Sequence, residues 1–170
     1  MRRSMVLAAV LAATVLLGLS AAPALAQSAG QTIDVGGWKV TRTHKADGSF
    51  EQCSSNIKYD DKSILAFAVN AAGKVFLVIV EPDFKLIEGQ TYKAKYRLDK
   101  TSAVSADAVA ADKTTLVIPV ANEDAFMPAA MAGNNLVIEA GGETVEEPLA
   151  GSKDAINQLA TCVAAGMKGS

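Results

Sequence analysis

The 170-residue sequence is poor in the residue types that most enzymes and metalloproteins use for chemistry. It contains two cysteines, one histidine and one tryptophan. It has no C-x-x-C pair, no G-x-S-x-G motif and no glycine-rich loop leading into a helix. The single histidine, His44, lies close to a predicted turn, and one histidine does not supply enough ligands for a zinc site. We therefore predict a non-enzymatic protein with no catalytic residue, no metal site and no cofactor.

A strong excess of basic residues is also absent. The chain has 16 Lys and Arg residues against 18 Asp and Glu residues. Its nearest approach to a basic cluster, Lys93, Lys95 and Arg97, alternates with Tyr92, Ala94 and Tyr96, which is typical of the exposed face of an amphipathic strand. This charge balance argues against a nucleic-acid partner.

Three pairs of acidic residues lack the ligand spacing of a calcium-binding loop. They are Asp60-Asp61, Glu123-Asp124 and Glu146-Glu147. We interpret all three as solvated turns rather than as sites.

Residues 1–26 have the three parts of a secretory signal peptide. Arg2 and Arg3 give a charged start, residues 6–19 are apolar, and Ala24-Leu25-Ala26 matches an A-x-A cleavage site. The apolar run is shorter than the roughly 20 residues that span a bilayer. We therefore predict cleavage before Gln27, no stable membrane span in the mature chain, and a periplasmic or secreted bacterial protein.

The rest of the chain is long enough for one domain with a substantial core. Residues 27–35 are mostly small and polar, and we expect them to form a flexible lead-in. Residues 36–166 should form a single β-rich domain, and residues 167–170 a short tail.

The central element is predicted at residues 74–80. Six consecutive apolar residues, Val75-Phe76-Leu77-Val78-Ile79-Val80, lie between Gly73 and Pro82 and indicate a strand buried on both faces. Shorter alternating runs and turn signals predict its neighbours, at about 38–43, 50–59, 64–69, 92–98, 114–120, 136–139 and 143–147. The alanine-rich segment 101–111 fits either a strand or a helix, and the turns beside it favour a strand.

Residues 152–166 are predicted to form the main helix. Ser152 is suited to the N-cap, Gly166 to the C-terminal end, and Ile156, Leu159, Ala160 and Val163 follow helical spacing. The predicted fold class is therefore mainly β: an antiparallel β-sandwich or partly open barrel with one C-terminal α-helix packed on it.

Asn122 is suited to cap a single helical turn that folds Phe126 and Met127 onto the sheet edge. These two apolar residues, next to Pro128, are the candidate surface contact. The sequence pattern alone leaves open whether they belong to a contact surface or to the core.

The two cysteines are predicted to form a disulfide. Cys53 shares the parity of the apolar residues on its strand, and Cys162 lies on the inward shoulder of the terminal helix. Export brings both to an oxidising compartment, and without a C-x-x-C pair they indicate a structural link rather than a redox site.

A resemblance to a known family rests on three short segments: Gly37-Trp38-Lys39-Val40, Cys53, and Leu149-Ala150-Gly151-Ser152 running into Ala155 and Leu159. Together they resemble the invasion-associated locus B proteins of alphaproteobacteria. The family usually has a further cysteine just after the tryptophan strand, where this chain has Arg42 and Thr43. The resemblance implies a β-sandwich with a helical appendage and a role in the envelope and in host-cell entry.

The functional hypothesis is a secreted or periplasmic envelope accessory or binding protein, whose partner is an unidentified protein or envelope component. The alternative is a periplasmic inhibitor of a host lysozyme or protease, in which residues 122–135 would form a loop that plugs a cleft. A third reading, an enzyme centred on His44, has the least support in the sequence.

Overall fold

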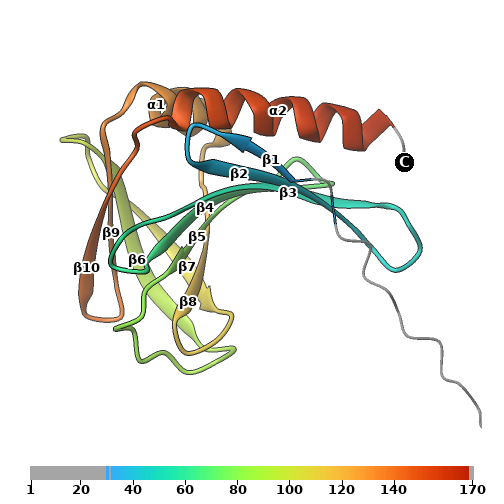
Figure 1. The fold of residues 1–170 in the computed structure, drawn as a ribbon. Helices are drawn as coiled ribbons and strands as arrows, with labels where there is room; N and C mark the ends of the chain where they lie inside the picture. The colour runs from blue at the N-terminus through green and yellow to red at the C-terminus, as the bar shows by residue number, and fades with distance from the viewer. Residues whose placement is uncertain (1–29, 31, 169–170) are drawn as a thin grey trace, which may run out of the picture.

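The computed structural model describes residue 30 and residues 32–168, which form one antiparallel sheet with two helices on one side (Figure 1). Within this part of the chain the sheet has ten strands in the order β1-β2-β3-β4-β5-β8-β7-β6-β9-β10. The elements are β1 (Thr32–Val35), β2 (Trp38–His44), β3 (Phe50–Lys58), β4 (Ile64–Asn70), β5 (Val75–Val80), β6 (Thr91–Leu98), β7 (Val104–Ala110), β8 (Thr115–Pro119), α1 (Glu123–Ala132), β9 (Asn135–Ala140), β10 (Glu143–Pro148) and α2 (Ser152–Lys168).

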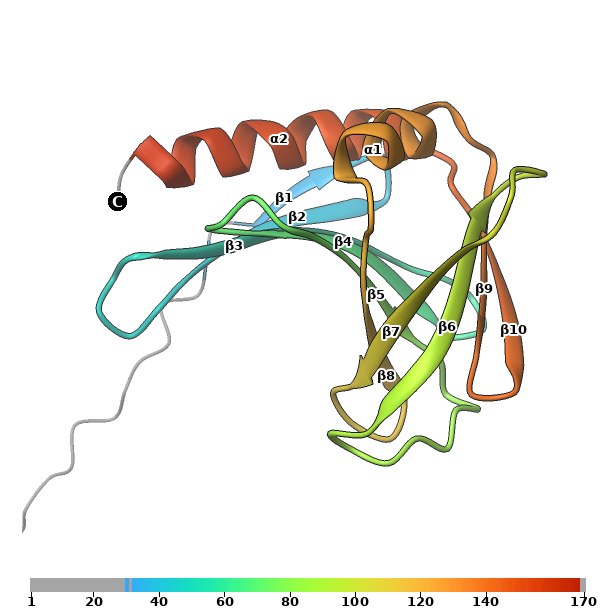
Figure 2. The same cartoon turned by 180° about the vertical axis from the view of Figure 1, so that it is seen from behind.

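The sheet is open and strongly curled. Figures 1 and 2 show β1–β4 beneath α2, with β6, β9 and β10 turning away so that the sheet encloses a concave side. Alternate residues of every strand face this side, as in the buried cross-strand row Phe67, Leu77 and Ile118. A mainly antiparallel β fold of the predicted class, sandwich or partly open barrel, is confirmed, and segment 104–110 is a strand.

Strand β5 is central, but it is not fully buried on both faces as expected. Its inward residues Leu77 and Ile79 are fully buried, whereas Phe76, Val78 and Val80 are half-buried. Both helices pack on the concave side, so the outward side chains of β5 are covered only by their neighbours in the sheet. The convex face at the centre of the sheet is therefore apolar and partly exposed.

Two elements extend beyond the expected bounds. Residues 32–35, expected to lie in a flexible lead-in, form β1, whose β-branched residues pair antiparallel with β2. The single turn expected after Asn122 is a ten-residue helix, α1, capped by the Asn122 side chain, which accepts from the Ala125 N–H at 3.2 Å. The helix continues because Phe126 and Ala130, one turn apart, are both buried.

The N-terminal end of α2 is held by two side-chain hydrogen bonds. The indole Nε1 of Trp38 donates to the Ala150 carbonyl oxygen at 2.9 Å. The Ser152 hydroxyl donates to the Ala130 carbonyl oxygen of α1 at 2.8 Å. Ser152 is the first residue of α2 rather than the expected N-cap, and its hydroxyl joins the two helices.

The predicted disulfide between Cys53 and Cys162 is present. The two Cα atoms are 6.2 Å apart, and the bond links residues separated by 109 positions. It fixes the C-terminal half of α2 to β3 on the concave side. A structural disulfide of this kind is typical of proteins that work outside the cytoplasm.

Gly166 does not end the helix as the sequence suggested, because α2 continues to Lys168. It is buried, and a Cβ atom at this position would lie only 2.5 Å from ring atoms of Phe50 on β3. Glycine is therefore required here for close packing of helix on sheet.

We predict that Gly166→Ala lowers the free energy of unfolding, although alanine is the better helix former by about 1 kcal/mol. The added methyl group must push α2 away from Phe50. Urea denaturation followed by circular dichroism tests this, and Phe50→Leu in the same chain should restore part of the loss. A Gly166→Ala protein more stable than the parent would contradict the packing argument.

We also predict that replacing both cysteines by alanine lowers the free energy of unfolding by about 2–5 kcal/mol, since the disulfide restricts the unfolded chain. The same denaturation measurement applies. The parent protein with both thiols reduced is the matched control, and it should be destabilised to a similar extent. Equal stability of the oxidised parent and the double variant would show that the bond contributes nothing.

Candidate functional site

A strongly apolar hollow lies between α1 and α2, and we call it the α1–α2 groove. Its volume is about 460 Å³. It carries no charged side chain, and Asn157 is its one polar residue. Its lining comes from α1, α2 and the end of β4, and includes Met127, Met131, Val163, Met167 and Val69.

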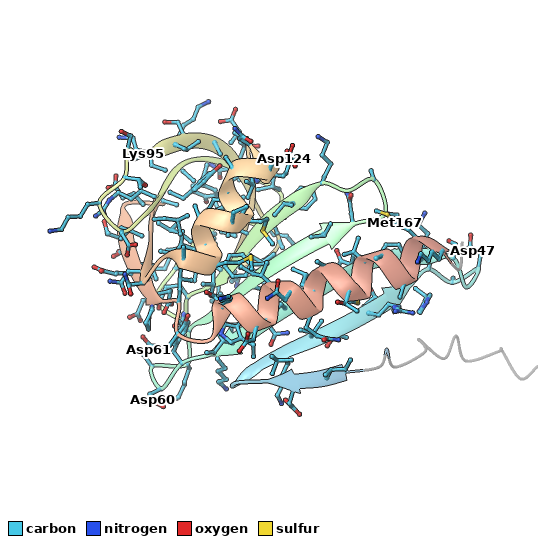
Figure 3. All side chains as sticks on the ribbon, turned by 90° about the horizontal axis from the view of Figure 1, so that it is seen from above. Asp47, Asp60, Asp61, Lys95, Asp124 and Met167 are labelled. Atoms are coloured by element: carbon cyan, nitrogen blue, oxygen red, sulfur yellow. A yellow bond between two sulfur atoms is a disulfide. The ribbon has the colours of Figure 1, made fainter. Side chains whose placement is uncertain are left out.

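The groove follows from the residue spacing of the two helices. On α1, Phe126 and Ala130 point into the core, while Met127 and Met131 form a second, half-buried row beside them. On α2, buried Leu159 is followed at intervals of four by half-buried Val163 and exposed Met167. Figure 3 shows the two helices over the sheet, with Met167 at the C-terminal end of α2. Each row of apolar residues therefore supplies one wall.

The two residues of the candidate surface contact have different positions. Phe126 is only 7% exposed, and its ring packs edge-on against Tyr96 at 5.6 Å and tilted against Phe67 at 6.2 Å, measured between ring centroids. It is a core residue and not a surface contact, because the long α1 turns it toward the concave face. Met127, one residue later, lines the groove.

Sequence reasoning missed Met131 and Met167. Met127 and Met131 are four residues apart in the sequence. This interval places two side chains on the same face only in a helix longer than a single turn. Met167 was assigned to the tail because Gly166 was read as a helix end. Both omissions follow from underestimating helix length.

The structure places the single histidine, His44, at the surface. It is exposed at the end of β2, opposite Phe50. Among residues 30 and 32–168, no group of three or more His, Cys, Asp or Glu side chains is placed to hold a metal ion. None of the helices in these residues has the length and hydropathy to cross a membrane.

Two of the three acidic pairs behave as surface features. The Asp61 carboxylate accepts from the Ser63 hydroxyl at 2.7 Å and from the Ser63 N–H at 2.9 Å, and these bonds lower the pKa of Asp61. Glu123 has a lowered pKa because its own backbone N–H and the Lys74 ammonium stabilise its charge. The Asp61 hydrogen bonds therefore belong to a turn, and the Glu123 interactions belong to the start of α1.

Glu147 is the exception, and the interpretation of its pair as a solvated turn is wrong. It is only 3% exposed, and its Oε1 atom has no hydrogen-bond partner among the described residues. Burial raises the pKa of Glu147; the Ser63 hydroxyl acts in the opposite direction, and the charges of Asp61 and Glu81 raise the pKa further. Its parity with buried Val145 on β10 was the sequence signal for an inward position.

We predict that Glu147→Gln raises the free energy of unfolding at pH 7. Folding raises the pKa of this carboxyl above its ordinary value of 4.5, so the stability of the parent falls as the pH rises through the interval between the two values. The gain should vanish below about pH 4, where the carboxyl is protonated in both states. Thermal unfolding between pH 3 and pH 8 measures it, and a gain that does not change with pH would contradict the assignment.

Comparisons with known proteins bear on the fold. No model of a known protein family and no curated protein sequence matches the chain. Among solved structures, the chain is similar to invasion associated protein B from Bartonella henselae, with a TM-score of 0.53 and 16% sequence identity over 77% of this chain and 96% of that one. The resemblance predicted from the tryptophan strand, Cys53 and residues 149–152 is thus confirmed at the level of the fold, which this protein shares with invasion associated protein B.

Proposed function

We propose that this protein is a non-enzymatic binding protein of the bacterial envelope, periplasmic or secreted, and that its α1–α2 groove holds an apolar helix of a partner protein. The observation that carries the proposal is the groove itself: an apolar hollow of about 460 Å³ with a partly exposed methionine lining. Methionine side chains are flexible and polarisable, and they are common on surfaces that adapt to a partner.

The lining favours a polypeptide helix over a small molecule. Small-molecule sites are also mostly apolar, but they normally contain a small number of precisely placed polar groups that fix the ligand's orientation. Here Asn157 is the one polar residue of the groove. Rows of apolar side chains on two adjacent helices are instead suited to the apolar face of a third helix, which presents side chains at intervals of three and four residues.

The envelope location in this proposal is supported by the disulfide and by the predicted leader. The Cys53–Cys162 disulfide is typical of an oxidising compartment. The predicted leader, residues 1–26, lies outside the described residues and remains a prediction from sequence. The structural neighbour from Bartonella henselae is described as invasion associated, which supports a host-interaction role in the envelope for this chain.

The inhibitor alternative gains no support from the structure. Residues 122–135, expected to form a cleft-plugging loop, are mostly helix α1, and Phe126 and Ala130 anchor that helix in the core. A rigid helix packed in this way does not protrude as an inhibitory loop. The non-enzymatic assignment rests on the scarcity of catalytic side chains in the sequence.

We predict that Ala160→Glu and Met167→Glu, each placing a charge at an exposed position of the groove, reduce partner recovery at least tenfold. A buried carboxylate has no partner in an apolar contact, so binding should weaken. Affinity capture from envelope extract with quantitative mass spectrometry measures recovery.

Ile87→Glu is the matched control, because Ile87 is 65% exposed and does not line the groove. It should leave recovery unchanged, and thermal unfolding should show that all three variants are folded. If the groove variants and the control recover the same proteins in the same amounts, the groove is not the binding surface.

A further inference from the structure

A second hollow, of opposite character, lies beside β10. We call it the acidic hollow; its volume is about 560 Å³, and three segments line it: 60–62, 81–83 and 143–147. These segments contribute seven carboxylates and one basic side chain, Lys62. Figure 3 shows Asp60 and Asp61 on the β3–β4 turn, at the far side of the molecule from Met167.

One wall of the hollow is the free edge of the sheet. Strand β10 pairs with β9 over its whole length, and no described strand pairs with its other side. At the end of this edge the Tyr59 hydroxyl donates to the Pro148 carbonyl oxygen at 2.7 Å. The remaining outward N–H and C=O groups of β10 are in the arrangement that accepts an added strand.

Glu147 supplies an observation independent of the acidic cluster. It lines the hollow, it is 97% buried, and its Oε1 atom has no hydrogen-bond partner among the residues that the structure describes. A buried carboxylate with one oxygen lacking a hydrogen-bond partner is unfavourable, and Asp61 and Glu81 add repulsion. A cationic group entering the hollow would give the Glu147 oxygen a partner and would offset the repulsion from Asp61 and Glu81.

The geometry favours a cation carried on a long side chain. In the described part of the chain the carboxylates are not grouped closely enough to ligate one metal ion. Arginine or lysine bridges such spacing, because its charge lies at the end of a flexible stem. In an extended peptide, alternate side chains project to the same face, so basic residues at every second position would all face the acidic side.

We propose that the free edge of β10 and the acidic hollow bind an extended basic polypeptide segment, which adds to the sheet as a further strand and places a basic side chain against Glu147. This site is separate from the α1–α2 groove, so the proposal stands independently of the one made for the groove.

The test uses a capped, fluorescently labelled heptapeptide in which arginine alternates with valine, with anisotropy as the readout. Binding to the parent protein should weaken at least tenfold in Glu147→Gln. Glu51→Gln is the matched control, since it removes the same charge from an exposed position at the opposite end of β3; it should change binding less than twofold. Thermal unfolding of Glu147→Gln establishes that it is folded.

Two further probes separate strand addition from general charge attraction. A heptapeptide with proline in place of the central valine lacks one backbone N–H and should bind at least fivefold more weakly. Spermidine, which carries charge without a peptide backbone, should compete poorly.

The proposal is overturned if the arginine–valine peptide does not bind, or if Glu147→Gln and Glu51→Gln weaken binding equally. Strand addition is overturned if the proline peptide binds as well as the original, or if spermidine displaces the peptide at equal charge concentration.

Discussion

Helix α2 covers the concave face of an otherwise open sheet, and the rest of the structure depends on its being held there. Its N-terminal end is held by the Trp38 indole, which donates to the Ala150 carbonyl just before the helix, and by the Ser152 hydroxyl, which donates to α1. Its C-terminal half is fixed to β3 by the disulfide. Between these points Ile156 and Leu159 are buried, each contributing roughly 1.5–3 kcal/mol relative to exposure. Because α2 is attached near both ends, its position relative to α1 is fixed. The groove between the two helices is therefore already formed in the folded protein.

Much of this fold was readable from the sequence, because an antiparallel sheet with one buried face produces alternation, and turns carry glycine and aspartate. The disulfide was also predictable, since two cysteines in a chain that is predicted to be exported have one intramolecular pairing. Strand β1 was missed because its few polar and β-branched residues gain order only by pairing with β2. The half-exposure of Phe76, Val78 and Val80 was missed because a continuous apolar run does not reveal which face the helices cover. Gly166 was misread because a helix end and a close helix–sheet contact both favour glycine.

The candidate sites were less predictable than the fold. Met127 was identified from the sequence, but the groove also needs Met131 and Met167, which become neighbours only through the lengths of α1 and α2 and their mutual packing. Glu147 was misread because an acidic pair in a short strand resembles a solvated edge, although its parity with buried Val145 places it on the inward face, opposite Leu136. The two surfaces also differ in chemistry. The α1–α2 groove is apolar and adaptable, whereas the acidic hollow is charged and lies beside the backbone N–H and C=O groups of β10. The two surfaces are therefore suited to polypeptide segments of different composition.

The disulfide also sets an order of events during synthesis. A polypeptide leaves the ribosome from its N-terminus, so Cys53 emerges 109 residues before Cys162. The first thiol has no intramolecular partner during this interval, since the chain contains two cysteines in all. The disulfide can therefore close only after the last helix has been made and has reached an oxidising environment.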